Sequence, residues 1–360
     1  MIYRALWPII RSIDAETAHH LTLHMLKMGA GALWPAGKSP ASLSSTVLNL
    51  NFPNPIGIAA GFDKDGVAAA PLLKLGFGFI ELGTVTPRPQ AGNPKPRLFR
   101  LEENKAVINR MGFNNQGVEA LVARLARHRP NGVIGINIGA NKDSPDRLAD
   151  YVTAFHAVAP YADYITANIS SPNTKGLRDL QRGAELRDLI ARLQEARASS
   201  ARTLPLFVKI APDLEPRELD DVIRISLEAK LDGLIISNTT VGGRAGLKGP
   251  HADEKGGLSG VPLFRRSTDM LAEVRRQAGN RLILIGVGGV GSARDAYEKI
   301  LAGASLVQLY TGLVYQGPGL IRRIKHGLAE LLKADGFATI SAAVGARLPV
   351  ARVPEPTRSH

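Results

Sequence analysis

Short apolar runs recur along most of the chain and alternate with longer segments of helical periodicity. The runs lack strict alternation of apolar and polar positions, which is typical of strands that are buried on both faces of a sheet. The eight runs are IGIAA (56–60), FIELG (79–83), VIGINIG (133–139), YITANIS (164–170), LFVKI (206–210), GLIIS (233–237), LILIGV (282–287) and LVQLY (306–310).

Eight strand–helix units in this order predict an α/β fold, a closed (β/α)8 TIM barrel over residues 46–334. A doubly wound parallel sheet is the alternative. The proline-rich stretch at 85–110 is too long for a tight connection, so we expect an excursion over the barrel mouth.

Two helices are predicted within residues 1–40, over MIYRALWPIIRS (1–12) and from Asp14 over DAETAHHLTLHMLKMG (14–29). The second shows an apolar face at spacings of three and four, formed by Ala18, Leu21, Met25 and Met28. Such a hairpin either packs on the core or lies on a membrane surface with Trp7 as an anchor. The histidines of the second helix are expected to be solvated: His19, His20 and His24.

The last segment, residues 335–360, is predicted to be a flexible tail. No stretch approaches the roughly 18 to 20 apolar residues that a membrane-spanning helix needs.

Charge and composition limit the kinds of ligand and catalytic group that the protein can use. The chain has 45 Lys and Arg against 32 Asp and Glu, a formal net charge of +13. Because these charges are scattered and aromatic residues are few, we expect a basic surface or a small anionic substrate and no nucleic-acid partner. The absence of cysteine excludes thiolate metal sites and cysteine nucleophiles, and no histidine and carboxylate set has metal-binding spacing, so no metal is predicted.

The ends of the predicted strands carry most of the candidate chemistry, because a barrel places its site at the carboxyl ends of its strands. The residues found there are Asp63, Lys64, Thr84, Asn137, Asn168, Ser170, Ser171, Lys209, Ser237, Asn238, Thr239, Gly288, Gly289, Tyr310 and Thr311. Two lysines among amides and hydroxyls predict a site for a phosphorylated cofactor and a small polar anion.

The glycine-rich segment GVGGVG (286–291) matches the dinucleotide-binding fingerprint between a strand and a helix. A Rossmann site also needs an acidic residue at the end of the next strand, whereas that strand ends in Tyr310 and Thr311. A phosphate site of the barrel type is the favoured interpretation, and plain turns are the remaining one.

Nine motifs in order resemble the dihydroorotate dehydrogenase family: AAGFDKDG (59–66), GTVTPRPQAGNPKPRLFR (83–100), NRMGFNN (109–115), NIGANKD (137–143), NISSPNT (168–174), VKIAPDL (208–214), SNTT (237–240), GGLSG (256–260) and GVGG (286–289). Ser171 stands where the soluble class has cysteine. Together with the N-terminal helices, this serine resembles the membrane-associated, quinone-dependent class 2.

The resemblance implies oxidation of (S)-dihydroorotate to orotate in pyrimidine (UMP) biosynthesis. FMN would accept the hydride, and a membrane quinone, ubiquinone or menaquinone, would be the final acceptor. It also implies a peripheral protein on the cytoplasmic side of the inner membrane, held to the bilayer by the N-terminal helices.

The same resemblance implies roles for individual residues. Ser171 would be the catalytic base, with Thr174 as its relay. Substrate would be held by Lys64, Asn109, Arg110, Met111, Gly112, Phe113, Asn168, Asn173, Asn238 and Thr239. FMN would be held by Ala60, Gly61, Phe62, Asp63, Lys64, Thr84, Asn137, Asn168, Lys209, Ser237, Gly260, Gly289, Tyr310 and Thr311. Arg100 is a candidate quinone neighbour.

Two other functions stay open at this point. One is a different FMN barrel enzyme, such as a class 1 relative or a tRNA dihydrouridine synthase, although the cysteine that the latter requires is missing. The other is a non-enzymatic basic binding protein on a barrel scaffold.

Overall fold

A closed barrel of eight parallel strands forms the centre of the protein in a computed structural model, which describes residues 2–348. Every predicted strand is present, and the barrel is confirmed. In chain order the strands are β3 (Ile56–Ile58), β4 (Phe79–Val85), β7 (Val133–Ile138), β8 (Tyr164–Asn168), β9 (Leu206–Ile210), β10 (Gly233–Ile236), β12 (Ile283–Val287) and β13 (Leu306–Leu309). Each strand pairs with the next in this order, and β13 pairs with β3 to close the barrel.

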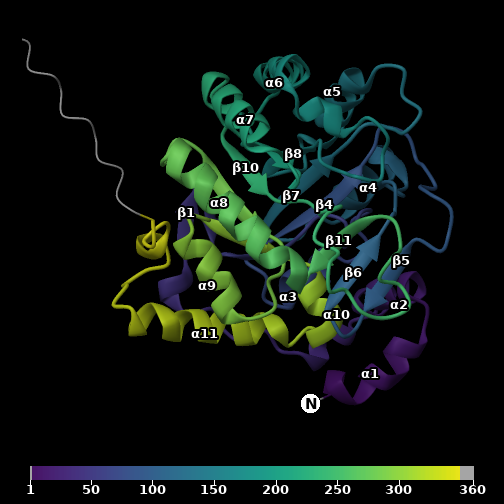
Figure 1. Ribbon diagram of the computed structural model, residues 1–360, viewed down its shortest axis with the longest axis vertical. Coiled ribbons are helices and arrows are strands. Elements are labelled where there is room, and N and C mark those ends of the chain that lie inside the picture. The colour runs from purple at the N-terminus through teal and green to yellow at the C-terminus, as the bar shows by residue number, and fades with distance from the viewer. Residues whose placement is uncertain (1, 349–360) are drawn as a thin grey trace, which may run out of the picture.

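Helices surround the barrel because each strand is followed by a helical crossover to the next (Figure 1). They are α3 (Ala69–Lys74), α4 (Gly117–Arg127), α5 (Arg147–Val158), α6 (Gly183–Ala198), α7 (Pro216–Glu228), α8 (Phe264–Ala278), α9 (Ala293–Leu301), α10 (Thr311–Gln316) and α11 (Leu320–Ala334). The strands are buried on both faces, which explains their continuous apolar runs.

A hairpin of β1 (Ser45–Val47) and β2 (Leu50–Phe52) closes the amino-terminal end of the barrel. Phe52 packs there with Phe79, at a ring separation of 5.4 Å, and with Phe207 inside the barrel. With this end closed, a ligand site is left to the opposite end.

The excursion predicted at 85–110 forms part of a second, small sheet. Strands β5 (Leu98–Leu101), β6 (Ala106–Asn109) and β11 (Gly257–Gly260) pair antiparallel in the order β11-β6-β5. Tyr315 of α10 donates a hydrogen bond of 2.6 Å to the Ala106 carbonyl and so joins this sheet to the barrel.

The N-terminal helices, α1 (Ile2–Ser12) and α2 (Ala15–Lys27), lie together at one edge of the barrel, beside β5 and α10 (Figure 1). The Asp14 side chain caps α2 by accepting from the Thr17 amide at 2.9 Å. The Trp7 ring packs against Tyr315 in a tilted arrangement, 5.5 Å between ring centres, and Arg100 donates to the Ile13 carbonyl at 2.9 Å. These contacts fix the hairpin on the barrel at its carboxyl end.

Most of the expected apolar face of α2 does not face the barrel, and of its four members only Ala18 is buried. Leu21, Met25 and Met28 are 44%, 46% and 74% exposed. The barrel-facing stripe is instead formed, at spacings of three and four, by Glu16, His19, Leu23 and Leu26. Hydrophobic periodicity missed this stripe because its first two members are polar.

Short 3-10 helices complete the described chain: η1 (Ala30–Leu33), η2 (Ala41–Leu43), η3 (Arg178–Gln181), η4 (Val261–Leu263) and η5 (Ser341–Ala343). The expectation of a flexible tail does not hold for residues 335–348. Ile340 and Ala343 are fully buried against the core, and the Gly345 amide donates to the Ile300 carbonyl at 2.9 Å. The rest of the predicted tail, residues 349–360, lies outside the described residues.

Candidate functional site

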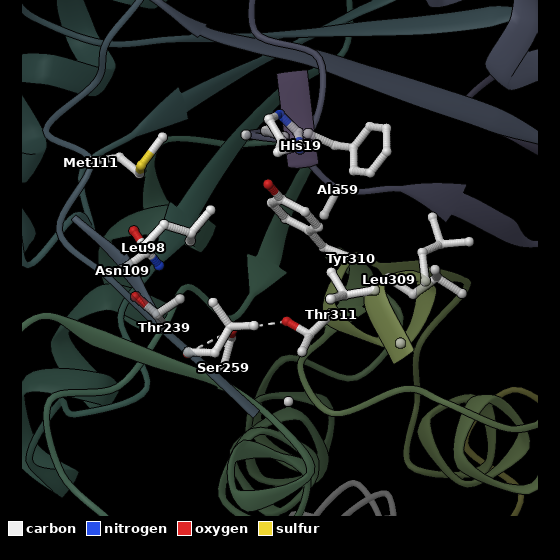
Figure 2. Close-up of a pocket in the computed structure, with 18 of the residues that line it drawn as sticks. His19, Ala59, Leu98, Asn109, Met111, Thr239, Ser259, Leu309, Tyr310 and Thr311 are labelled. Carbon is white, nitrogen blue, oxygen red and sulfur yellow. Dashed lines mark hydrogen bonds between the residues drawn. The ribbon is translucent and has the colours of Figure 1, made fainter. Parts of the chain in front are cut away.

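One pocket of about 310 Å³ opens at the carboxyl ends of the barrel strands and extends outward beneath the N-terminal helices. Its inner wall is polar, and its outer part is lined by apolar side chains of α1 and α2 that include Leu6, Ile10 and Leu26. Figure 2 shows His19 close to the Tyr310 ring, with Asn109 and Thr239 across the open space.

The structure brings most of the predicted site residues to the wall of this pocket. They are Ala60, Gly61, Phe62, Lys64, Thr84, Asn109, Met111, Gly112, Phe113, Asn168, Ser171, Asn173, Lys209, Ser237, Asn238, Thr239, Gly260, Gly289, Tyr310 and Thr311, and Arg100 joins them near the outer end. Five predicted residues do not line it: Asp63, Arg110, Asn137, Ser170 and Thr174.

Asp63 holds the backbone of the loop after β3. Its carboxyl oxygens accept from the amides of Val67 at 2.9 Å and Ala68 at 2.7 Å. Burial raises the pKa of this carboxyl to about 6, despite these hydrogen bonds. Asp63 therefore shapes the loop that carries Lys64.

Arg110 points away from the pocket. It pairs with Glu254 at 2.6 Å and stacks on the Phe99 ring at 4.6 Å from the ring centre. Side chains alternate sides along an extended segment, so Asn109 facing the pocket sends Arg110 outward. The proposed contact of Arg110 with substrate is therefore not supported by its position.

Asn137 lies one layer below the pocket, inside the barrel, and binds Glu81, which sequence reasoning missed. One Glu81 oxygen accepts from Asn137 at 2.8 Å, and the other accepts from Tyr164 at 3.0 Å and from Gln308 at 2.6 Å. A charged residue within the apolar run 79–83 was the available signal, because such a residue is buried only with partners.

A chain of hydrogen bonds rises from Asn137 to the pocket wall. Thr84 donates to the Asn137 side-chain oxygen at 2.5 Å and accepts from Asn168 at 2.8 Å. The Asn168 side-chain oxygen in turn accepts from Ser170 at 3.1 Å and from Asn238 at 3.3 Å. The orientations of these amides are thus fixed from the barrel interior outward.

Two ammonium groups point into the pocket, those of Lys64 and Lys209. Neither forms an ion pair or a side-chain hydrogen bond with another residue in the described range 2–348. Burial lowers the pKa of Lys64 to about 8. Burial also lowers the pKa of Lys209, and the charge of Glu81 partly offsets this effect. Buried cations without partners are suited to anionic ligands.

Ser171 follows β8 and is 5% exposed on the pocket wall. Its Oγ accepts from the Asn173 amide at 3.2 Å, and the Asn173 side chain donates to the Asn109 carbonyl at 3.1 Å. Thr174 is buried behind this wall. The loop therefore presents one hydroxyl, that of Ser171, to the pocket.

His19 lines the pocket and is not a solvated surface residue as predicted. Its ring meets Phe62 edge-on at 5.2 Å and lies 6.1 Å from the Tyr310 ring. Burial and the nearby Lys64 charge lower the pKa of His19 to about 3, so the imidazole is neutral at physiological pH.

A buried ion pair ties α2 to the segment 91–97, which contacts the pocket wall at Asn173. Arg97 donates to Glu16 at 2.7 and 3.1 Å, and both side chains are almost fully buried. Arg97 also donates to the carbonyls of Ala91 and Asn93. The Asn93 side-chain nitrogen Nδ2 donates to the Asn173 carbonyl at 3.1 Å. The helix and the pocket wall at Asn173 are thus mechanically connected.

These features define the class of the protein: a (β/α)8 barrel with a small-molecule site at the carboxyl ends of its strands, extended by an N-terminal helical hairpin that completes the pocket. The family profile described as dihydroorotate dehydrogenase matches residues 42–332. The chain belongs to this family.

The similar proteins agree in name and in fold. The chain is 54% identical over 340 residues to the dihydroorotate dehydrogenase (quinone) of Parvibaculum lavamentivorans, covering 94% of this chain and 97% of the relative. It is 51% identical over 346 residues to the protein of the same name from Rhodospirillum rubrum, covering 96% and 94%.

Solved structures of the Eimeria tenella DHODH are also similar. The complex with ferulenol has a TM-score of 0.88 and 38% identity, and covers 92% of this chain and 95% of that one. The ligand-free form has a TM-score of 0.89, also at 38% identity, and covers 92% and 99%. The predicted resemblance to the quinone-dependent class is confirmed.

Proposed function

We propose that this protein oxidises (S)-dihydroorotate to orotate in pyrimidine biosynthesis, with FMN as the hydride acceptor and a membrane quinone as the final acceptor. One observation carries the proposal: one pocket combines an amide cluster and two ammonium groups that have no partner in the described part of the chain, all at its inner end, with an apolar passage beneath the N-terminal helices. The names of the relatives support the same substrate and acceptor.

The inner wall fits FMN. Lys209 supplies a buried positive charge that has no partner among residues 2–348, which suits the N1 side of a reduced, anionic flavin ring. The backbone of Gly289 lies close to the backbone of Phe264, because a Cβ atom added to Gly289 would lie 2.8 Å from the Phe264 amide nitrogen. When bound, FMN would accept the hydride from carbon 6 of the substrate.

The flavin ring would be held by Ala60, Gly61, Phe62, Thr84, Asn168, Lys209 and Ser237. The ribityl chain and phosphate would be held by Gly260, Gly289, Tyr310 and Thr311. Asn137 and Asp63 would act from behind the wall, Asn137 by orienting Thr84 and Asp63 by shaping the loop after β3.

Substrate would bind across the pocket from the flavin. Lys64 would pair with its carboxylate, and the pyrimidine N–H and C=O groups would meet Asn109, Asn173, Asn238 and Thr239. Met111, Gly112 and Phe113 would cover it, since they form the adjoining pocket wall. Asn168 would touch both substrate and flavin.

Ser171 would remove the proton from carbon 5. The Asn173 amide that donates to Ser171 Oγ fixes the position of this hydroxyl. Because a serine hydroxyl is a weak base at neutral pH, the proton needs a further acceptor, and Thr174 is the proposed relay.

The outer, apolar part of the pocket would admit the quinone. His19 is neutral there and Arg100 supplies a cation near the entrance, so both are candidate neighbours of the quinone oxygens. Around this entrance, exposed apolar side chains gather on α1, α2 and η1: Leu6, Ile9, Leu21, Met25, Met28 and Leu33. They would rest on lipid.

Within the part of the chain that the structure describes, no helix is long and apolar enough to span a bilayer. The proposed location is peripheral, on the cytoplasmic side of the inner membrane, and the exposed apolar side chains of α1, α2 and η1 are the proposed contact surface.

An anaerobic absorbance titration of the purified protein tests the proposal. We expect a flavin spectrum that bleaches on addition of dihydroorotate and returns on addition of a quinone. If dihydroorotate leaves the flavin spectrum unchanged, the substrate is a different compound. Purified, folded protein that neither contains nor binds flavin would refute the cofactor assignment.

A further inference from the structure

Lys299 of α9 is a buried lysine that the proposed reaction does not use. Its side chain is 0% exposed. The ammonium group donates to Ser267 Oγ at 2.9 Å and to Thr268 Oγ1 at 3.0 Å, and lies 5.1 Å from the centre of the Phe264 ring. All three contacts belong to the first turns of α8.

This ammonium group has no close countercharge among residues 2–348, where it forms no ion pair. Two carboxylates act on it from a longer distance, Asp295 on α9 and Asp269 on α8. They do not offset burial, which lowers the pKa of Lys299 to about 7. A cation buried in this way is destabilising unless a negative charge compensates it.

The hydroxyl partners of Lys299 do not require it. Ser267 and Thr268 both donate to the Phe264 carbonyl, at 3.1 and 2.7 Å. An apolar side chain at position 299 would therefore leave α8 with its hydroxyls satisfied. Internal hydrogen bonding gives no reason for a charge here.

The α8 turn that Lys299 binds backs directly onto the glycine turn at the end of β12. Ser267 Oγ lies 3.4 Å from the Gly288 carbonyl oxygen. A Cβ atom added to Gly288 would lie 2.7 Å from Ser267 Oγ. On the other side, Gly288 and Gly289 line the pocket at the proposed phosphate end. Only Ser267 and the Gly288–Gly289 turn thus separate the Lys299 ammonium group from the proposed phosphate end of the pocket.

We infer that Lys299 is a positioning residue for the phosphate of the flavin cofactor, and that the phosphate dianion is the countercharge of its ammonium group. The inference rests on the proposed function, because it requires FMN in the pocket. The lysine acts through Ser267 and the Gly288–Gly289 turn without touching the cofactor. Its charge favours the phosphorylated flavin over the same ring without phosphate.

The test compares FMN with riboflavin on the full-length chain freed of flavin by dialysis, with flavin fluorescence quenching as the measurement. In Lys299→Met, which keeps length and removes charge, we expect the dissociation constant for FMN to rise on the order of tenfold. The constant for riboflavin should change by less than about twofold, because riboflavin carries no phosphate charge.

Lys325→Met is the matched control. Lys325 is also buried, at 1% exposed, but it donates to the Gly37 carbonyl at 3.2 Å and to Ser39 Oγ at 3.4 Å, away from the pocket. Its replacement should leave the ratio of the two dissociation constants unchanged. Lys299→Gln, which keeps a donor for the α8 hydroxyls, serves if Lys299→Met does not fold.

Three results would overturn the inference. An unchanged FMN constant in the Lys299 variants would show that the charge is not felt at the phosphate. An equal rise of the dissociation constants for FMN and riboflavin in Lys299→Met would show a structural role for Lys299. A change in the ratio of these constants in Lys325→Met as large as that in Lys299→Met would show the same. If the unmodified chain binds neither flavin, the proposed function itself fails, which is a separate outcome.

Discussion

The buried pair of Glu16 and Arg97 offers the sharpest test of how the N-terminal hairpin is held. Both side chains are nearly inaccessible, and Arg97 approaches the carboxylate through two nitrogens at 2.7 and 3.1 Å. Replacing Glu16 by Gln keeps the shape but leaves a buried guanidinium without its countercharge. Breaking a buried pair in this way costs about 3 to 5 kcal/mol.

The lower end of that range, about 3 kcal/mol, applies because Arg97 keeps its hydrogen bonds to the Ala91 and Asn93 carbonyls. An unfolding entropy of roughly 2.1 cal/mol/K per residue over the chain converts this loss to a fall in Tm of about 4 °C. Glu228→Gln is the matched control. The pair of Glu228 with Arg224 is exposed, and its loss should cost at most about 0.5 kcal/mol.

The effect should also depend on pH. Burial alone raises the pKa of Glu16, but the Arg97 hydrogen bonds and the charges of Arg97, Lys95 and His20 outweigh it, so the pKa lies below its ordinary value. A lowered pKa in the folded state stabilises the protein above the unfolded pKa of about 4.3, and this contribution is lost as the pH falls below it.

Urea and thermal unfolding of the parent, Glu16→Gln and Glu228→Gln at pH 7 and near pH 4 measure these differences. We expect the gap between parent and Glu16→Gln to shrink at the lower pH. The reasoning is refuted if Glu16→Gln unfolds at pH 7 within about 1 °C of the exposed-pair control.

Four further predictions concern the site. Ser171→Ala should slow flavin reduction by dihydroorotate about 10²- to 10⁴-fold in stopped-flow absorbance, with the bound flavin spectrum unchanged. Thr174→Ala should slow the same step at least about tenfold if Thr174 is the relay, and an unchanged rate excludes that role. Because Lys64 must be protonated to hold a carboxylate and its pKa is about 8, kcat/KM should fall as the pH rises through that value, and Lys64→Met should lose this dependence. Leu21→Ser combined with Met28→Ser should weaken sedimentation with lipid vesicles while turnover with a short-chain quinone stays at the parent rate; unchanged sedimentation would show that this face does not bind lipid.

The barrel could be predicted from sequence because its signal is local. Each strand is buried on both faces, so each appears as a continuous apolar run, and the polar residues at or beyond the carboxyl end of the run identify the pocket wall. Lys64, Asn168 and Lys209 were found in this way. The small sheet of β5, β6 and β11 was not, because β11 pairs with β6 from a distant part of the chain.

Other errors share a different physical cause. Hydrophobic periodicity treats a polar residue as solvent-facing, whereas Glu16, His19 and Glu81 are placed inward by partners that periodicity does not detect. The same limitation produced the wrong apolar face for α2. Arg110 was placed in the pocket with its neighbours along the motif, although alternation along the strand sends it outward.

The positions of the buried lysines connect the basic composition to the proposed chemistry. Lys64, Lys209 and Lys299 each lie at or directly behind the pocket, and none forms an ion pair within residues 2–348. The proposed ligands carry three centres of negative charge: the substrate carboxylate, the reduced flavin ring and the phosphate. Each lysine lies beside the place proposed for one of them. The pocket without ligands is therefore electrostatically unbalanced, and binding of the ligands should stabilise the fold as well as the reacting atoms.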